Sequence, residues 1–325
     1  MTSSPLTIWC NLQLTERSLA SLQGGLGEHR LVRAAGLTAC YQPIGRHDPG
    51  LAEADIAFGQ PEADQCVTST RLRWIHLASA GYTTFASGDV RAALLALGIP
   101  LTNSSSVYDE PCAQHALAFM LAEARQLPGS FRDQATSHAW NTGPTRAASF
   151  LLKGQTALLV GYGAIAKRLA ELLSPFGLHV IGFRRRPRGD EAMAVYPVAE
   201  LPQWLPRADW VIDILPAAID TADFFDGAKF AAMKIGASFI NIGRGTTVDQ
   251  AALLAALRGP LRAAYLDVTA PEPLPPEHPL WSTPNCFITP HVAGGHEDED
   301  DRLVALFLTN LDRYQRGQPL AGRVY

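Results

Sequence analysis

The segment TALLVGYGAIAKRLAELL places an apolar run directly before a glycine-rich turn and a helix-forming stretch directly after it. Gly161, Gly163 and Ala166 occupy the three small-residue positions of the pattern G-x-G-x-x-G/A. In that pattern the first position allows a tight turn, the second lets the backbone approach a pyrophosphate, and the third allows close helix–strand packing. Because the required strand and helix are both present, the segment predicts a dinucleotide-binding unit. The alternative is a packing turn in another α/β fold.

Apolar runs alternate with helix-forming stretches along the rest of the chain. Before the glycine loop, the runs that predict buried strands are LTIWC, LTACY, DIAFG, WIHLA and IPLTN. After it, the corresponding runs are HVIGF, WVIDIL, SFINIG, AAYLDV and CFITP. Such alternation is typical of parallel sheets covered by helices. The sequence therefore predicts two doubly wound α/β domains, of which the second binds the nucleotide.

Four other segments have a recognisable character. LAEADI and VRAALLALG are helix-forming, and a long apolar-faced helix is expected from Val107 to Leu127. The mixed stretch SHAWNTGPTRAASFLLKG around Trp140 is loop-like and predicts an arm or connector. Residues 297–317 form an amphipathic pattern with an acidic first turn, which suits the positive end of a helix dipole. His296 and this acidic run either cap the helix or line the mouth of a pocket.

Composition excludes several classes of protein. The chain has 325 residues, 47% of them hydrophobic and 18% charged, which describes a globular protein with length enough for two domains. A formal net charge of -4 gives no basic footprint for nucleic acid, and no apolar run approaches the roughly 20 residues of a membrane span. Five scattered cysteines and the lack of a signal-peptide pattern predict a cytoplasmic protein without a metal site. A small-molecule partner is expected.

The strand after the glycine loop ends in the basic run HVIGFRRRPRG. An acidic residue about 20 positions after the loop would bind the ribose 2′-hydroxyl of NAD. Arg184 stands 18 positions after Ala166 (184 − 166 = 18), more arginines follow, and the first carboxylate is Asp190. Arginines at a strand end can bind a 2′-phosphate, so Arg184 and Arg185 favour NADP(H) over NAD(H). The alternative is a solvated basic turn.

Three charged residues follow in order, each in a distinctive context: Arg244 in NIGRGTTVD, Glu272 in LDVTAPEPLP and His291 in ITPHVAGG. An arginine can hold a carboxylate through two parallel hydrogen bonds. A histidine can transfer a proton near neutral pH, and a carboxylate can stabilise its imidazolium form. Taken singly, Arg244 could cap a helix, Glu272 could lie in a surface turn, and His291 could be a hydrogen-bonded histidine in a core. Together with the glycine loop they predict a dehydrogenase that moves hydride at a carbon beside a carboxylate.

The same segments resemble the D-isomer-specific 2-hydroxyacid dehydrogenases, in particular their glyoxylate and hydroxypyruvate reductases. VGYGAIA, INIGRGTTVDQAALLAAL, AYLDVTAPEPLPPEHPLW and PNCFITPHVAGG match the family in order and spacing. The resemblance is weak only in the first sixty or so residues and in the arm around Trp140. It implies a Rossmann nucleotide-binding domain over 105–291, inserted into a flavodoxin-like substrate-binding domain formed by 1–104 and 292–325, with a cleft between them. It also implies a homodimer, with the arm as the contact.

The resemblance further assigns roles to residues. It implies that Arg244 binds the substrate carboxylate, that His291 is the general acid/base, and that Glu272 hydrogen-bonds His291. It implies that Asp267 orients the nicotinamide. The turn expected to receive the substrate carboxylate on its backbone amides comprises Ser79, Ala80 and Gly81. The expected cofactor site comprises Gly161, Gly163, Ala164, Ile165, Arg184, Arg185, Leu215, Pro216 and Asp267.

Two departures from the family pattern concern the surroundings of this site. Thr269 stands where an aromatic residue is usual, and Pro216 is followed by Ala217, where a polar residue is common.

The expected reaction is reduction of a small 2-oxo acid, glyoxylate or hydroxypyruvate first, to the D-2-hydroxy acid with NADPH. The alternative is a dinucleotide-sensing protein of the same fold that acts through a protein partner, like the family's corepressors.

Overall fold

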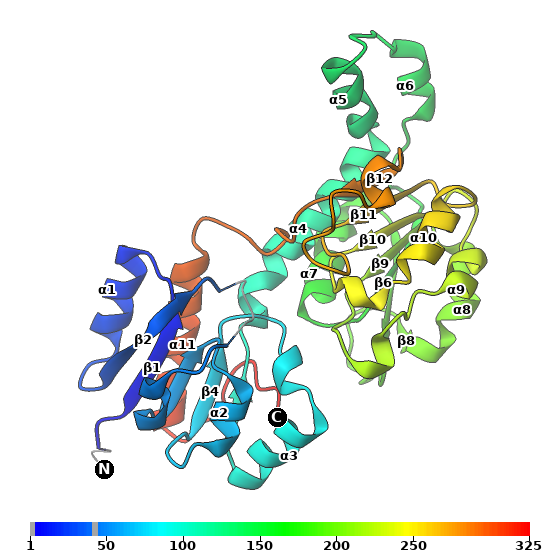
Figure 1. Cartoon of the computed structure of the whole chain (residues 1–325). Coiled ribbons are helices and arrows are strands. Elements are labelled where there is room, and N and C mark those ends of the chain that lie inside the picture. Colours follow the sequence, from blue (N-terminus) through cyan, green and yellow to red (C-terminus); the bar gives the residue numbers. More distant parts are fainter. Residues whose placement is uncertain (1–3, 41–44) are drawn as a thin grey trace. The chain divides into compact units, whose positions relative to one another are not determined.

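The computed structural model describes residues 4–40 and 45–325, so Tyr41, the last residue of the expected strand LTACY, lies outside the described residues. The chain divides into two compact units, Met1–Tyr108 with Gly295–Tyr325 and Asp109–Gly294. Each unit is a parallel sheet with helices on its faces, which confirms the predicted pair of α/β domains (Figure 1). None of the described helices has both the length and the apolar character that crossing a bilayer requires.

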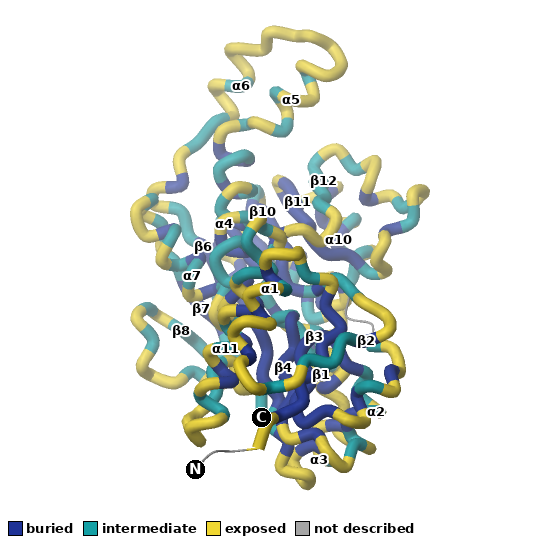
Figure 2. The backbone as a smooth tube through the Cα atoms, turned by 90° about the vertical axis from the view of Figure 1, so that its left-hand side faces the viewer, coloured by how far each residue is buried: buried dark blue, intermediate teal, exposed yellow. Residues whose placement is uncertain are grey.

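The first unit contains a five-stranded sheet in the flavodoxin-like order β2-β1-β3-β4-β5. Its strands, all parallel, are β1 (Thr7–Leu12), β2 (Arg30–Thr38), β3 (Ile56–Gly59), β4 (Trp74–Leu77) and β5 (Leu101–Thr102). The central strands are buried along their whole length, as Figure 2 shows in dark blue. This burial explains why they are continuous apolar runs and not alternating ones, because helices cover both faces of a parallel sheet.

The helices of the first unit include one from the far end of the chain. They are α1 (Glu16–Gly25), α2 (Ala63–Thr68), α3 (Gly88–Leu97) and α11 (Glu299–Gln315). Phe307 of α11 stacks on Phe58 of β3 with ring centroids 4.2 Å apart, so the C-terminal helix completes the core that the N-terminal strands begin. The acidic first turn of α11 contacts α1, because the Thr15 amide donates to Asp300 and the Ser18 hydroxyl donates to Asp301.

The second unit contains a seven-stranded parallel sheet in the order β12-β11-β10-β9-β6-β7-β8. The strands are β6 (Thr156–Val160), β7 (His179–Arg184), β8 (Val195–Pro197), β9 (Trp210–Asp213), β10 (Ser238–Asn241), β11 (Ala263–Leu266) and β12 (Cys286–Ile288). The helices around it include α7 (Ala164–Leu173), α8 (Leu201–Trp204), α9 (Gly227–Ala232) and α10 (Gln250–Leu257). The strand order reverses between β6 and β9, the switch point at which sheets of this kind bind ligands.

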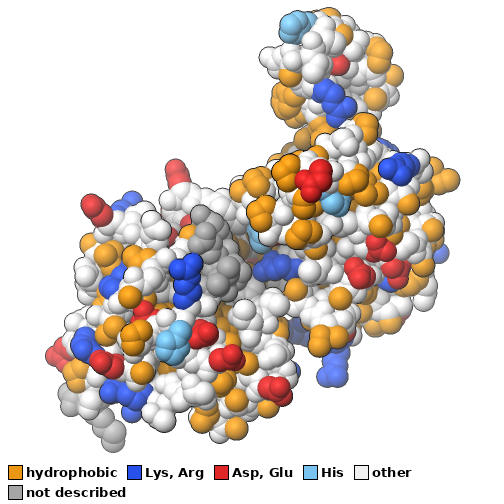
Figure 3. Space-filling view, viewed as in Figure 1, with side chains coloured by type: hydrophobic (Ala, Val, Ile, Leu, Met, Phe, Trp, Pro, Cys, Tyr) orange, Lys and Arg blue, Asp and Glu red, His pale blue; other side chains and the backbone are white. Residues whose placement is uncertain are grey.

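The long helix predicted from Val107 to Leu127 is α4 (Ser105–Ala124). It stops earlier than predicted because Gln126 takes a left-handed conformation, with φ of 57°, that a right-handed helix cannot continue. The helices α5 (Leu127–Ala135) and α6 (Thr142–Ala148) follow, so the expected loop around Trp140 is partly helical. This α5–α6 hairpin extends from the second unit and carries hydrophobic side chains on its surface (Figures 1 and 3). Trp140 is 94% exposed and Phe131 is 62% exposed.

One short helix prediction was wrong in part. The segment LAEADI was expected to be helical, but only its first three residues belong to a 3-10 helix, Pro49–Glu53, and its last residue begins β3. Asp48 caps that short helix by accepting the Gly50 amide, and Asp55 accepts the Thr7 amide from the neighbouring strand β1. Asp55 therefore binds the neighbouring strand just before β3 begins, a side-chain role that helix propensity does not reveal.

Candidate active site

The predicted site residues of the second unit follow the carboxyl ends of adjacent parallel strands, which meet at one edge of the sheet. Gly161 follows β6, Leu215 and Pro216 follow β9, and Arg244 follows β10. Asp267 and Glu272 follow β11, and His291 follows β12. The strand order thus brings together side chains that are up to 130 positions apart in the sequence (291 − 161 = 130).

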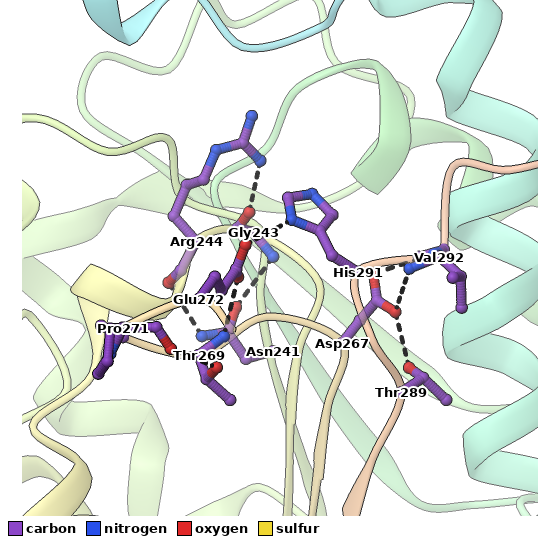
Figure 4. A network of polar contacts seen from close by, with 12 residues as sticks. Asn241, Gly243, Arg244, Asp267, Thr269, Pro271, Glu272, Thr289, His291 and Val292 are labelled. Atoms are coloured by element: carbon purple, nitrogen blue, oxygen red, sulfur yellow. Dashed lines mark hydrogen bonds and ion pairs between the residues drawn. The ribbon is translucent and has the colours of Figure 1, made fainter. Parts of the chain in front are cut away.

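His291 and Glu272 are in direct contact, with Nδ1 of the histidine 2.8 Å from Oε2 of the glutamate (Figure 4). An ionised carboxylate only accepts, so Nδ1–H donates and Nε2 is the ring nitrogen that can exchange a proton with another molecule. The second oxygen of Glu272 accepts the Thr269 amide at 3.0 Å. Burial alone would raise the pKa of Glu272, but the hydrogen bonds from His291 and Thr269 and the nearby cations lower it overall. Glu272 therefore remains a carboxylate beside the imidazole.

Arg244 extends to the same side of the loops as the His291 ring (Figure 4). Its Nη1 donates to the carbonyl of Gly243 at 2.6 Å, and the side-chain Nδ2 of Asn241 donates to the Arg244 carbonyl at 3.0 Å. Burial lowers the pKa of Arg244, while the negative charge of Glu272 acts to raise it. Because a guanidinium keeps its proton in proteins, Arg244 supplies a fixed positive charge beside the histidine–carboxylate pair.

Close packing of two loops sets the position of Arg244. A Cβ atom on Gly245 would overlap the backbone of Thr269, so only glycine lets the Arg244 loop approach the loop that carries Glu272. On its other side, the Thr247 hydroxyl lies 2.6 Å from the Arg244 carbonyl oxygen and 2.5 Å from the Asp213 carboxyl. Burial raises the pKa of Asp213 to about 7, although its hydrogen bonds with Thr247 and Leu215 act to lower it.

Asp267 is 2% exposed, and its carboxylate binds the segment that carries His291. Oδ1 accepts the Thr289 hydroxyl at 2.6 Å and the Val292 amide at 2.9 Å, and Oδ2 accepts the Ala293 amide at 2.9 Å. The His291 amide donates to the Asp267 carbonyl at 2.8 Å, and His291 has a φ of 54°. The structure thus gives Asp267 a second task besides the cofactor contact that the resemblance implied, which is to hold the histidine in an unusual backbone conformation.

His115 of α4 was not predicted from the sequence, and it contacts this segment at Thr289. Its Nε2 is 3.1 Å from the Thr289 hydroxyl and 3.7 Å from Oδ1 of Asp267. The Thr289 hydroxyl donates its hydrogen to Asp267, so its oxygen accepts from Nε2–H. Burial lowers the pKa of His115, although the charge of Asp267 acts to raise it.

Two further residues of the site were not predicted, although their positions in the sequence gave a weak indication of their role. Asn241 and Asp213 are polar residues that end buried strands, where a side chain commonly binds the following loop. Asn241 does so through both amide atoms, because Oδ1 also accepts the Gly243 amide at 2.9 Å. Nothing in the sequence around His115 links it to Thr289, 174 positions away.

The glycine loop has the geometry that a pyrophosphate requires. Gly161 has a φ of +102°, and a Cβ there would lie 2.6 Å from the carbonyl oxygen of Ile214. Among the described residues, a Cβ at Gly163, which precedes α7, would meet no atom within 4 Å, and no side chain caps the helix. The first-turn amides of α7, those of Ala164 and Ile165 among them, therefore point to the loop surface, where they can bind an anion. The fully buried Ala166 packs beneath.

A cavity of about 370 Å³ continues from this loop to the end of β7. It is lined by Tyr162, Gly163, Ala164, Lys167, Arg184, Arg188, Asp190, Glu191 and Ala192. Arg184 is partly buried and pairs with Glu191, whereas Arg185 is 71% exposed and pairs with Asp220 at 2.8 Å. Of the two predicted arginines, Arg184 belongs to the cavity and Arg185 to the surface. The residues that line this cavity suit an adenosine diphosphate moiety.

The predicted turn of Ser79, Ala80 and Gly81 belongs to the first unit, where it follows β4. All three carbonyls of the turn accept hydrogen bonds. The Ser104 amide donates to Ser79, the Asn103 side chain donates to Ala80, and the Ser79 hydroxyl donates to Gly81. The turn is therefore fixed through its carbonyl groups.

The doubly wound sheet, the glycine loop at its switch point and the histidine–carboxylate pair beside an arginine define an NAD(P)-dependent oxidoreductase. Comparison with known proteins specifies the family. Residues 117–293 match the model of the D-isomer specific 2-hydroxyacid dehydrogenase NAD binding domain. The chain belongs to the D-isomer specific 2-hydroxyacid dehydrogenase family.

Named relatives place it near one group of that family. It is 31% identical to the glyoxylate reductase/hydroxypyruvate reductase of Mus musculus over 256 residues, which cover 77% of this chain and 76% of the relative. It is 32% identical to a glyoxylate/hydroxypyruvate reductase B of Klebsiella pneumoniae over 280 residues, 83% of this chain and 84% of the relative. Among solved structures, an NADPH-dependent glyoxylate/hydroxypyruvate reductase of Sinorhizobium meliloti with NADP and sulfate is 25% identical, with a TM-score of 0.77 and 98% of each chain covered.

Proposed function

We propose that the protein reduces a small 2-oxo acid, with glyoxylate and hydroxypyruvate as the first candidates, to the corresponding D-2-hydroxy acid with NADPH. The observation that carries this proposal is the 2.8 Å contact between His291 and Glu272 beside the cationic Arg244. A general acid, a group that stabilises its charged form and a carboxylate-binding cation are the protein parts that this reduction needs. The names of the relatives supply the candidate substrates.

In the proposed mechanism, NADPH held at the glycine loop would supply the hydride for reduction of the substrate carbonyl. His291 donates the proton on Nε2 to the carbonyl oxygen, and Glu272 stabilises the imidazolium before that transfer. Arg244 binds the substrate carboxylate and offsets the negative charge that develops on the carbonyl oxygen. Asp267 keeps His291 in place through the segment that it binds.

The same proposal assigns the remaining predicted residues. The turn of Ser79, Ala80 and Gly81 receives the substrate carboxylate, which makes residues 1–104 and 292–325 the substrate-binding domain and residues 105–291 the nucleotide-binding domain. Gly161, Gly163, Ala164 and Ile165 bind the pyrophosphate. Leu215 and Pro216 contact the cofactor from the loop after β9, and Asp267 orients its nicotinamide end. The protein is expected to be cytoplasmic.

The preference for NADPH rests on Arg184 at the carboxyl end of β7. This is the end of the sheet at which such domains bind the adenosine ribose, and a guanidinium there can bind a 2′-phosphate. The Sinorhizobium relative is named as NADPH-dependent and was solved with NADP, which supports the same choice. Arg185 contributes charge at the surface, where it is paired with Asp220.

The α5–α6 hairpin supports a homodimer. It exposes Phe131 and Trp140, two large apolar side chains of the kind that interfaces between proteins bury. A second copy of the chain is the proposed partner, and size-exclusion chromatography with light scattering measures the state directly. A monomer that stays a monomer at micromolar concentration would contradict this part of the proposal.

The experiment that tests the proposed function follows nicotinamide absorbance with the purified protein, glyoxylate or hydroxypyruvate, and NADPH or NADH. Turnover that prefers NADPH is the expected result. Equal turnover with NADH would contradict the proposed preference for NADPH, but the proposed reaction would stand. Binding of the cofactor without turnover of either acid, or of a panel of bulkier 2-oxo acids, would instead favour the dinucleotide-sensing alternative.

A further inference from the structure

Glu191, just after the basic run, folds back onto it. Its Oε1 accepts the Arg188 amide at 2.7 Å and lies 3.4 Å from Nη1 of Arg184, and its Oε2 accepts the Gly189 amide at 2.7 Å. Two consecutive backbone amides and a guanidinium thus converge on one carboxylate. This is the set of donors with which proteins bind phosphate groups.

The backbone of the basic run is shaped for this contact. Gly189 has a φ of +83°, a left-handed conformation that favours glycine, and the amides of Arg188 and Gly189 both donate to Glu191. The Glu191 side chain is only 8% exposed, although it lies in the loop between β7 and β8, beside exposed residues. The hydrogen bond from the Arg188 amide is the main cause that lowers the pKa of Glu191, and burial opposes it. The carboxylate is therefore a bound anion.

This bound anion lies in the cavity that also contains the glycine loop. Gly163, Ala164 and Lys167 line it from the glycine loop and α7, and Arg184, Arg188 and Glu191 line it from the end of β7 and the basic run. A dinucleotide whose pyrophosphate binds at α7 has its adenosine ribose near the end of β7, where Arg184 stands. A 2′-phosphate on that ribose needs the donors that Glu191 already uses.

We propose that Glu191 is an internal competitor for the 2′-phosphate site of the cofactor and thereby sets how strongly the protein prefers NADPH to NADH. The proposal rests on the proposed binding of NADPH at Arg184. A 2′-phosphate carries more charge than a carboxylate and can displace Glu191, whereas a ribose hydroxyl carries none and leaves it in place. The internal carboxylate lowers the affinity for NADPH and leaves the affinity for NADH unchanged.

The test is calorimetric titration of the whole protein with two fragments, adenosine 2′,5′-bisphosphate and 5′-ADP. Glu191→Gln removes the charge and keeps the shape, so it should bind the 2′,5′-bisphosphate about tenfold more tightly than the wild type and bind 5′-ADP equally well. Glu191→Asp keeps the charge but is one methylene shorter, and it should gain part of that affinity. Glu277→Gln is the control, because it makes the same substitution at an exposed position that does not line the cavity. It should change both affinities by less than about threefold, as expected for a screened surface charge.

The outcomes separate this inference from the cofactor preference. If the wild type prefers the 2′,5′-bisphosphate and Glu191→Gln leaves the preference unchanged, the inference fails while NADPH use stands. If the wild type shows no preference and Glu191→Gln creates one, the inference stands and the proposed use of NADPH fails. Weaker 5′-ADP binding by Glu191→Gln would show that the carboxylate binds the ribose hydroxyls, which overturns the inference. An unchanged melting temperature confirms that the variants are folded.

Discussion

The carboxyl of Asp213 and the hydroxyl of Thr247 lie 2.5 Å apart inside the second unit, and the same hydroxyl lies 2.6 Å from the carbonyl oxygen of Arg244. A hydroxyl has one hydrogen and cannot donate to both oxygens. A protonated Asp213 resolves the conflict, because its own hydrogen is donated to Thr247 while Thr247 donates to Arg244. The raised pKa of Asp213, about 7, agrees with this arrangement.

The first prediction concerns the pH dependence that Asp213 brings. Its pKa is raised in the folded protein, so the folded state binds a proton that the unfolded state, with a pKa near 3.9, has released. The contribution of Asp213 to stability is therefore expected to fall as pH rises from about 4 to about 7, and to level off above that. Asp213→Asn mimics the neutral form, and its melting temperature should decline less than that of the wild type between pH 5 and pH 8. Parallel melting curves for the two proteins would contradict the assignment.

The second prediction concerns the proton donor. His291→Asn should lower kcat by about 10²–10⁴-fold, the usual contribution of a general acid, and change the Kd for NADPH by less than about twofold. His138→Asn is a matched control, because His138 is also a histidine with a left-handed backbone, at a φ of 53° against 54°. Asparagine tolerates that conformation, so both variants should fold. Steady-state kinetics and a cofactor titration measure the effects, and full turnover by His291→Asn would remove this residue from the mechanism.

The third prediction concerns the charge of Glu272. Its lowered pKa keeps it ionised throughout the working range, and its stabilising contact with His291 is lost only as pH falls through that lowered value. Glu272→Gln keeps an acceptor for Nδ1–H but no longer stabilises the imidazolium. Proton donation by His291 should therefore slow, with kcat lower by about tenfold or more in steady-state kinetics. An unchanged kcat would show that the carboxylate charge does not assist the histidine.

The fourth prediction concerns the Thr289 hydroxyl, which joins Asp267 to His115. Thr289→Val removes the hydroxyl at nearly constant volume, and it should lower kcat by about tenfold, because hydrogen bonds to charged groups contribute about 1.5–3 kcal/mol. Thr289→Ser restores the hydroxyl and should recover most of the activity. Equal loss in both variants would assign the effect to packing. The KM for the oxo acid should change little, since Arg244 is untouched.

Much of this protein could be predicted from local patterns. Buried parallel strands are continuous apolar runs, so β3, β4, β6 and β9 were recognisable as strands. The glycine loop carries its own geometric requirement at Gly161, where the positive φ and the contact with Ile214 leave no room for a side chain. Because parallel strands end at one edge of a sheet, the order of Arg244, Glu272 and His291 along the chain also predicted that they gather there.

Tertiary structure decided what depends on contacts between distant segments. The end of α4 at Ala124 depends on the left-handed conformation of Gln126, which propensity does not specify. The contact of His115 with Thr289, the buried Asp213 beside Thr247, and the fold of Glu191 back onto its own basic run each join groups whose sequence context gives no sign of the partner. The sequence determined which chemical groups stand at the sheet edge, because that follows from local pattern. Only the folded chain decided how each group is charged and held, because burial and hydrogen bonding are properties of neighbours in space.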